Sequence, residues 1–232
     1  MREYLEATRS PLYSVLLALP LLIGYEVLVV LTETRYWAVR NAADVWIRVF
    51  LRAFEVSPHL ISFVMIGIAV ALIVPAKLRS PGVSLRFGYI WAMLFEAAIY
   101  SLLLGLVIRV VLSPILLAVG GFGDPGVLQA LALSLGAGLF EELFFRVILL
   151  NLLLFMLRPL IRSELWNALL CVTLASLLFS LSHYVGNMAD TFSIYSFLFR
   201  WIAGLLFTLL YYLRGFAVTA YTHALYDVRV LL

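Results

Sequence analysis

Charged residues are scarce in this chain: only 12% of its 232 residues are Asp, Glu, Lys or Arg, whereas 65% are hydrophobic. A soluble domain carries about 25% charged residues. So few charges cannot build a water-facing surface, and the surplus apolar side chains must face lipid. The sequence therefore predicts a multi-pass protein of the cell membrane, surrounded by the lipid bilayer, and excludes an ordinary soluble globular protein.

Neither a strong excess of one charge nor a set of cysteines is present. The 16 Lys and Arg and the 13 Asp and Glu give a net charge of +3 and fall in short clusters, so no nucleic-acid partner is expected. Cys171 is the single cysteine, which excludes an intrachain disulfide and a multi-Cys metal site. Because Cys171 lies in an apolar run, we expect a small buried apolar residue.

Long apolar segments make up most of the chain, and a spanning helix needs about 20 such residues. The first candidate contains Glu26 and precedes no small-residue cleavage site, so it is interpreted as a span and not as a signal peptide. We predict an all-α bundle of about seven spans that forms one domain, residues 1–232. The candidate spans are 11–32, 57–76, 87–108 with an apolar extension to 119, 127–157, 164–185, 193–213 and 216–232.

Residues 33–56 differ from these spans because Arg40, Asp44, Arg48 and Arg52 recur there at four-residue spacing. That spacing, with apolar residues on the other faces, predicts an amphipathic helix at the membrane interface. A solvated loop is the simpler alternative.

Loop charges predict an orientation. Lys or Arg residues occur around 77–86, at 158–162 and at 214, whereas 120–126 and 186–191 contain none. Positively charged loops are cytoplasmic, which with seven spans places the N-terminus inside and the C-terminus outside. The four Arg residues between positions 35 and 52 would then lie outside, against the rule, and an extra half-span there would reverse the N-terminus.

Ionisable residues within spans are concentrated at three places, and a charged group at the bilayer centre costs about 2.5–3.5 kcal/mol, so each needs a partner or a function. Residues four apart share a helix face. Two pairs are therefore expected, one within 127–157 and one within 216–232. The ionisable residues concerned are Glu141, Glu142 and Arg146 in the fourth span, His183 in the fifth, and His223 and Asp227 in the seventh.

Glu142 and Arg146 form one of these pairs, with the acid nearer the N-terminus as favoured, and His223 with Asp227 form the other. Glu141 and His183 have no partner within their own helices. Such groups on three helices are expected of a buried reaction centre, although a structural hydrogen-bond network is the simpler interpretation.

Small residues precede this centre, and acidic residues occur in two other spans. Gly136, Ala137 and Gly138 would let a neighbouring helix or a substrate approach closely, and plain helix packing explains them equally well. Glu26 and Glu96, in the first and third spans, either line the cavity or bind packing partners such as Arg109.

Three motifs carry a family resemblance. The motifs, in chain order, are Glu141-Glu142-x-x-x-Arg146, Phe179-x-x-x-His183 and His223-x-x-x-Asp227. In this order they resemble those of the CPBP family of metal-independent, glutamic intramembrane endopeptidases. That family includes CAAX prenyl proteases of the Ras-converting-enzyme type and bacterial sorting-type members. The resemblance covers residues 125–230, which would be the catalytic helices.

The resemblance implies a role for each residue and no metal or other cofactor. Glu141 would be the base that activates a water with His183, while His223 and Asp227 would stabilise the oxyanion. The supporting residues would be Glu142, Arg146 and Phe179. Many CAAX proteases have Asn where this chain has Asp227, and a carboxylate donates a hydrogen bond only when protonated. Asp227 is therefore either a protonated donor or, as we favour from the sequence, an ionised group that orients His223.

Three alternatives remain open. Glu141, His183 and His223 are ligand types of a catalytic zinc site, although no His-Glu-x-x-His motif occurs. Gly121-Phe122-Gly123-Asp124 and Tyr226-Asp227 read as the motifs of aspartyl intramembrane proteases but stand in the reverse order, and the glycine-rich stretch is typical of a turn. A transporter or scaffold would use the same ionisable groups to relay protons or bind an ion.

A buried site in lipid restricts the substrate to a protein that reaches it through the membrane. We expect cleavage near the C-terminus of a lipidated or membrane-anchored protein. The predicted orientation weakly favours an exported protein with a C-terminal anchor, as for sorting-type members, whereas a prenylated CAAX protein would need access from the cytoplasm.

Overall fold

The computed structural model describes residues 2–32, 40–58, 60–112, 126–186 and 189–232. Every regular element in these ranges is a helix, so the predicted all-α class is confirmed. The elements are α1 (Arg2–Thr8), α2 (Pro11–Thr32), α3 (Ala42–Arg52), α4 (Ile61–Ala71), α5 (Ile73–Leu78), α6 (Phe87–Leu112), α7 (Val127–Gly136), η2 (Ala137–Glu141), η3 (Leu143–Leu149), α8 (Leu150–Leu157), α9 (Glu164–Ser182), α10 (Ile194–Arg214) and α11 (Phe216–Leu231).

Five helical segments are long and apolar enough to cross a membrane: Pro11–Thr32, Ile61–Leu78, Phe87–Val111, Glu164–Ser182 and Ile194–Arg214. They correspond to five of the seven predicted spans. The fourth predicted span, 127–157, is helical but divided among α7, η2, η3 and α8, and the seventh is the 16-residue helix α11. The protein is thus a multi-pass membrane protein, and the count of seven spans stays a prediction.

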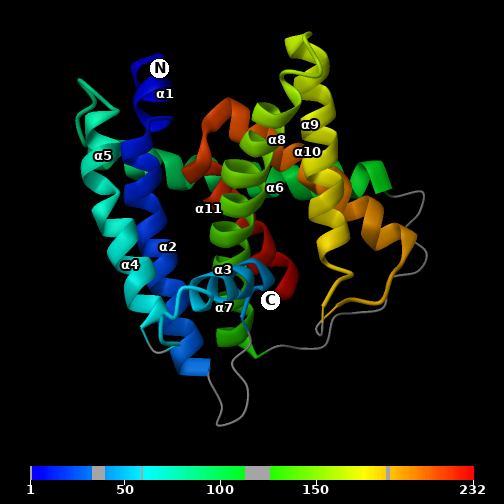
Figure 1. Cartoon of the computed structure of the whole chain (residues 1–232), viewed down its shortest axis with the longest axis horizontal. Helices are drawn as coiled ribbons and strands as arrows, with labels where there is room; N and C mark the ends of the chain where they lie inside the picture. The colour runs from blue at the N-terminus through cyan, green and yellow to red at the C-terminus, as the bar shows by residue number, and fades with distance from the viewer. Residues whose placement is uncertain (1, 33–39, 59, 113–125, 187–188) are drawn as a thin grey trace.

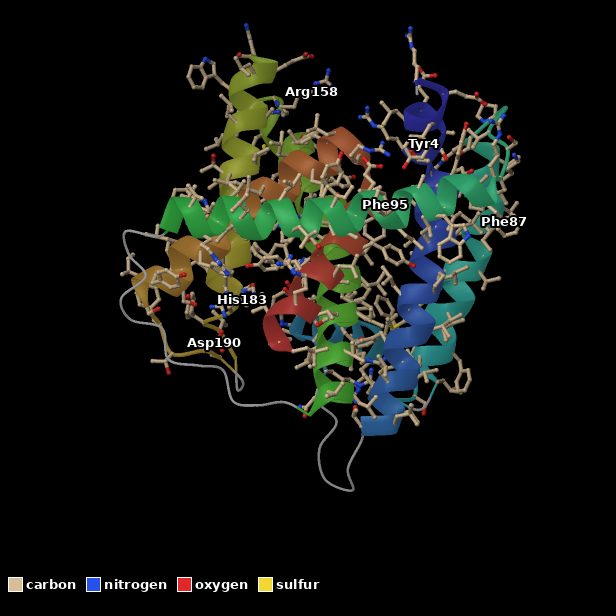
Figure 2. All side chains as sticks on the ribbon, turned by 180° about the vertical axis from the view of Figure 1, so that it is seen from behind. Tyr4, Phe87, Phe95, Arg158, His183 and Asp190 are labelled. Carbon is tan, nitrogen blue, oxygen red and sulfur yellow. The ribbon has the colours of Figure 1, made fainter. Side chains whose placement is uncertain are left out.

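The outward face of α6 shows why these helices need lipid. Phe87 and Phe95 are 84% and 70% exposed, and Figure 2 shows both on the α6 ribbon at the surface of the bundle. Burying such side chains against acyl chains removes a large apolar area from water. The helix therefore suits a bilayer and not an aqueous surface.

The bundle places α7 and α11 at its centre. In Figure 1, α2, α4 and α5 stand on one side and α8 and α9 on the other, while α6 crosses behind and α3 lies across α7. A side chain at Gly138 would clash with the Ala220 carbonyl and with Ala224 of α11. Helix packing, one of the two interpretations given for Gly136, Ala137 and Gly138, is therefore supported, because α11 occupies the space beside Gly138.

The helix α3 confirms the predicted amphipathic helix, so the alternative of a solvated loop is wrong for residues 42–52. Its charged face, however, points into the protein. Asp44 and Arg48 are buried, whereas Val49 and Phe50 are exposed. The physical reason is Glu26 of α2, which is ion-paired to Arg40 and Arg48. The charged face thus pairs within the protein and leaves the apolar face for lipid.

Glu96 joins three helices on the opposite side of the bundle. Its carboxylate pairs with Arg214 of α10 and accepts a 2.8 Å hydrogen bond from the Tyr4 hydroxyl of α1. Burial, followed by this hydrogen bond, raises the pKa of Tyr4 to about 12, so the phenol remains a donor. Glu26 and Glu96 therefore both bind packing partners, and Arg109 is not the partner of either among the described residues.

Candidate active site

The segment that carries the two adjacent glutamates is wound more widely than an α-helix. The consecutive elements η2 and η3 are π-helical, a winding that frequently occurs at functional sites, whereas α-helical geometry was predicted for this segment. Glu142 and Arg146 nevertheless meet, with 3.1 Å between Glu142 Oε1 and Arg146 Nη1, and both are buried. The predicted pair is confirmed.

The His223 ring is fixed by a glutamate on another helix. Its Nδ1 lies 2.7 Å from Glu142 Oε1, and the ring stacks on Phe207 with 4.3 Å between centroids. On the opposite edge, Nε2 lies 3.6 Å from Asp227 Oδ2 and 3.9 Å from Glu141 Oε2. Asp227 is therefore close to His223, as predicted, but Glu142 and not Asp227 makes the hydrogen bond that orients the ring.

His183 follows the last residue of α9, at the edge of the same group. Its Nδ1 donates to the Phe179 carbonyl oxygen at 2.9 Å, because a carbonyl can only accept. This bond leaves Nε2 as the open nitrogen. The Phe179 ring contacts both imidazoles edge-on, with its centroid 5.2 Å from that of His183 and 6.2 Å from that of His223.

Arg146 forms the buried floor of the site. Its guanidinium lies over the rings of Phe179 and Phe207, 4.6 and 5.6 Å from their centroids, and Nη2 donates to the Gly204 carbonyl at 3.3 Å. Arg146 therefore contacts Glu142 and both aromatic rings that touch the imidazoles. The supporting roles implied for Arg146 and Phe179 agree with these contacts.

Glu141 has a partner that the sequence analysis missed. Its Oε1 accepts a 2.7 Å hydrogen bond from Asn41 Nδ2, and both residues are buried. Asn41 immediately precedes α3, and an Asn before a helix signals an N-cap. No signal in the sequence linked that cap to a glutamate 100 residues away.

All seven predicted residues thus lie in one group, which His183 joins through its contact with the Phe179 ring. Among the described residues, no set of three His, Cys, Asp or Glu side chains is arranged to hold a metal ion. The Gly121–Asp124 motif of the aspartyl-protease alternative lies outside the described residues. Cys171 is buried, as predicted.

The fold and the site define a helical membrane protein with a buried cluster of glutamate, histidine and aspartate. Residues 123–229 match the Rce1-like family model, described as type II CAAX prenyl endopeptidase Rce1-like. The match confirms the resemblance carried by the three motifs, and the family that it describes is one of proteases. No curated protein and no solved structure matches the chain. Asn41 lies outside the matched residues.

Proposed function

We propose that the protein is an intramembrane endopeptidase that hydrolyses a peptide bond near the C-terminus of a lipidated or membrane-anchored protein, without a metal. One observation carries the proposal: Glu141 Oε2 lies 3.9 Å from His223 Nε2, and the Nδ1 atoms of His223 and His183 are both already hydrogen-bonded. Each ring therefore directs Nε2 toward substrate or water.

The proposed reaction begins with a water held between Glu141 and His183. Glu141 removes the proton from this water within hydrogen-bond reach of about 3 Å, while His183 Nε2 accepts the other hydrogen bond. The hydroxide adds to the scissile carbonyl carbon, and the carbonyl oxygen becomes an oxyanion. Glu141 then returns the proton to the leaving amine nitrogen as the C–N bond breaks, so no covalent intermediate is needed.

The oxyanion would lie beside His223 Nε2, on the side that carries Asp227. Because Nδ1 already donates its hydrogen to Glu142, Nε2 donates to the oxyanion only when the ring carries both protons, so the proposal takes His223 as an imidazolium. Preorganised donors at this position are worth about 10²–10³ in rate. Because Glu142 already orients His223, we assign Asp227 to the oxyanion as a protonated donor. This assignment replaces the orienting role that the sequence favoured, and it gives Asp227 the function of the Asn found in many CAAX proteases.

The substrate must reach this site from the lipid phase, because Glu142, Arg146 and His223 are buried inside the bundle. A CAAX prenyl endopeptidase family supports a prenylated C-terminus as the first substrate to test. A C-terminal transmembrane anchor, favoured by the predicted orientation, is the second.

The test uses protein purified in detergent and two peptides, one farnesylated with a CAAX terminus and one with an apolar anchor near its C-terminus. We expect release of a C-terminal fragment, detected by mass spectrometry, from at least one peptide, with activity unchanged by a chelator. Glu141→Ala should abolish release, whereas Glu164→Ala, an exposed glutamate at the start of α9, should not.

Other outcomes separate the alternatives. A complete loss with chelator that zinc restores would establish a zinc protease and overturn the metal-independent mechanism. Cleavage of neither peptide, together with ion-driven uptake by the protein in liposomes, would overturn the protease and support transport.

A further inference from the structure

We propose that Asn41 is a positioning residue for the protease reaction, which holds the Glu141 carboxylate in the geometry needed to activate water. The inference rests on the proposed function and extends it to the helices before residue 123. These helices lie outside the region that matches the protease family. The catalytic group would then depend on a residue that none of the three motifs contains.

The hydrogen bonds of Asn41 define which way its amide points. The side-chain oxygen accepts from the Ala43 backbone N–H at 2.9 Å and caps α3, while Nδ2 donates to Glu141 Oε1 at 2.7 Å. A flipped amide would place NH₂ against a donor and an oxygen against a carboxylate. Both partners therefore require the same orientation.

Close packing and a chain of polar contacts fix the position of Asn41 beside η2. A Cβ atom at Gly136 would lie 2.9 Å from Asn41 Cβ, so the glycine permits the close approach. The Asn41 backbone N–H donates to the Tyr25 hydroxyl at 3.2 Å, and that hydroxyl donates to Asp44 at 2.8 Å. Asp44 is in turn paired with Arg40 and Arg48.

The effect of Asn41 on catalysis depends on which oxygen of the Glu141 carboxylate it binds. Asn41 binds Oε1, whereas Oε2 lies toward His223, 3.9 Å from Nε2. A charge-assisted hydrogen bond on one oxygen restrains the rotation of the carboxylate and leaves the other oxygen to take a proton. Loss of such restraint lowers the rate because the reacting atoms are misplaced.

The test compares Asn41→Ser with Asn41→Ala in the peptide cleavage assay. Serine keeps a hydroxyl that can cap α3 but loses the amide donor, so we expect kcat to fall about 10- to 100-fold in both variants, with KM little changed. The acidic limb of the kcat–pH profile should move to higher pH, because a carboxylate that loses a donor is protonated more easily. Ser163→Ala, which removes only the cap of α9, should leave kcat unchanged.

A wild-type kcat in Asn41→Ser would overturn the inference, and so would a loss confined to KM or to thermal stability. If the Asn41 variants do not fold, Tyr25→Phe removes the acceptor for the Asn41 backbone and should lower kcat several-fold without touching Glu141. An unchanged kcat in Tyr25→Phe would then overturn the inference. If the wild-type protein cleaves neither peptide, the proposed function fails and the inference fails with it.

Discussion

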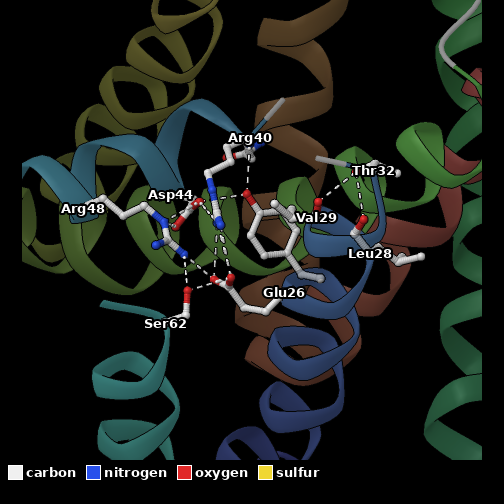
Figure 3. A network of polar contacts seen from close by, with 10 residues as sticks. Glu26, Leu28, Val29, Thr32, Arg40, Asp44, Arg48 and Ser62 are labelled. Carbon is white, nitrogen blue, oxygen red and sulfur yellow. Dashed lines mark hydrogen bonds and ion pairs between the residues drawn. The ribbon is translucent and has the colours of Figure 1, made fainter. Parts of the chain in front are cut away.

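Two buried clusters of ionisable side chains differ in how their charges are balanced. The first, which we call the α3 network, contains Glu26, Asp44, Arg40 and Arg48, two acids and two bases. Figure 3 shows these side chains pointing toward one another, with Ser62 of α4 at the edge. Every charge there has an opposite charge beside it, so the α3 network needs no ligand to be satisfied.

The catalytic cluster is different. Glu141, Glu142 and Asp227 provide three carboxyl groups, of which the proposal keeps Asp227 protonated, and Arg146 is the one guanidinium paired with any of them among the described residues. The remaining partners are imidazoles and the Asn41 amide. A cluster of paired acids and guanidinium groups indicates structure, whereas carboxyl groups gathered around imidazole nitrogens indicate chemistry.

The largest expected effect is a loss of stability when one residue of the α3 network is replaced. Arg48→Ala leaves Glu26 and Asp44 with one fewer counter-charge, and breaking a buried pair costs about 3–5 kcal/mol. Unfolding of the purified protein in detergent should show this loss. The matched control is Arg2→Ala, because the Arg2–Glu6 pair is exposed and its loss should cost less than about 1 kcal/mol. Equal stability losses in the two variants would contradict the comparison.

His223→Ala should produce the next effect, on rate and not on folding. Removing one oxyanion donor lowers kcat about 10²–10³-fold, which peptide cleavage kinetics would measure. Thr219→Ala changes the same helix at a buried hydroxyl that donates to the Gly215 carbonyl and should retain activity. A His223→Ala variant that keeps its kcat but loses stability would assign His223 to structure.

A smaller effect is expected from Asp227→Asn. If Asp227 donates to the oxyanion, an amide replaces it and kcat should change by less than about tenfold, or about 1.4 kcal/mol. A loss of about 10²-fold or more would instead support an ionised Asp227 that orients His223. The same cleavage assay distinguishes the two roles.

The sequence predicted what is local to one helix. The Glu142–Arg146 and His223–Asp227 pairs follow from four-residue spacing, and both are found. The partners of Glu141 and of His223 Nδ1 lie 100 and 81 residues away. Periodicity within a helix cannot predict such contacts, because the rotation of each helix is set by its packing against others.

The inward face of α3 was missed for a related reason. Arg40 and Arg48 look solvent-facing when α3 is considered alone, and only Glu26 on α2 makes their burial favourable. The π-helical winding at Glu141 has no pattern in the sequence that would have predicted it. Packing between segments therefore decided both features.

The most direct measurement compares Glu141→Gln with Glu26→Gln in stability and in peptide cleavage. Each replaces a buried carboxylate by an amide of the same shape, one in the catalytic cluster and one in the α3 network. We expect Glu141→Gln to remain folded and to release no detectable fragment, and Glu26→Gln to unfold more easily while its folded fraction cleaves within about tenfold of the wild-type rate. Cleavage by Glu141→Gln at a rate near that of the wild-type protein would contradict the account.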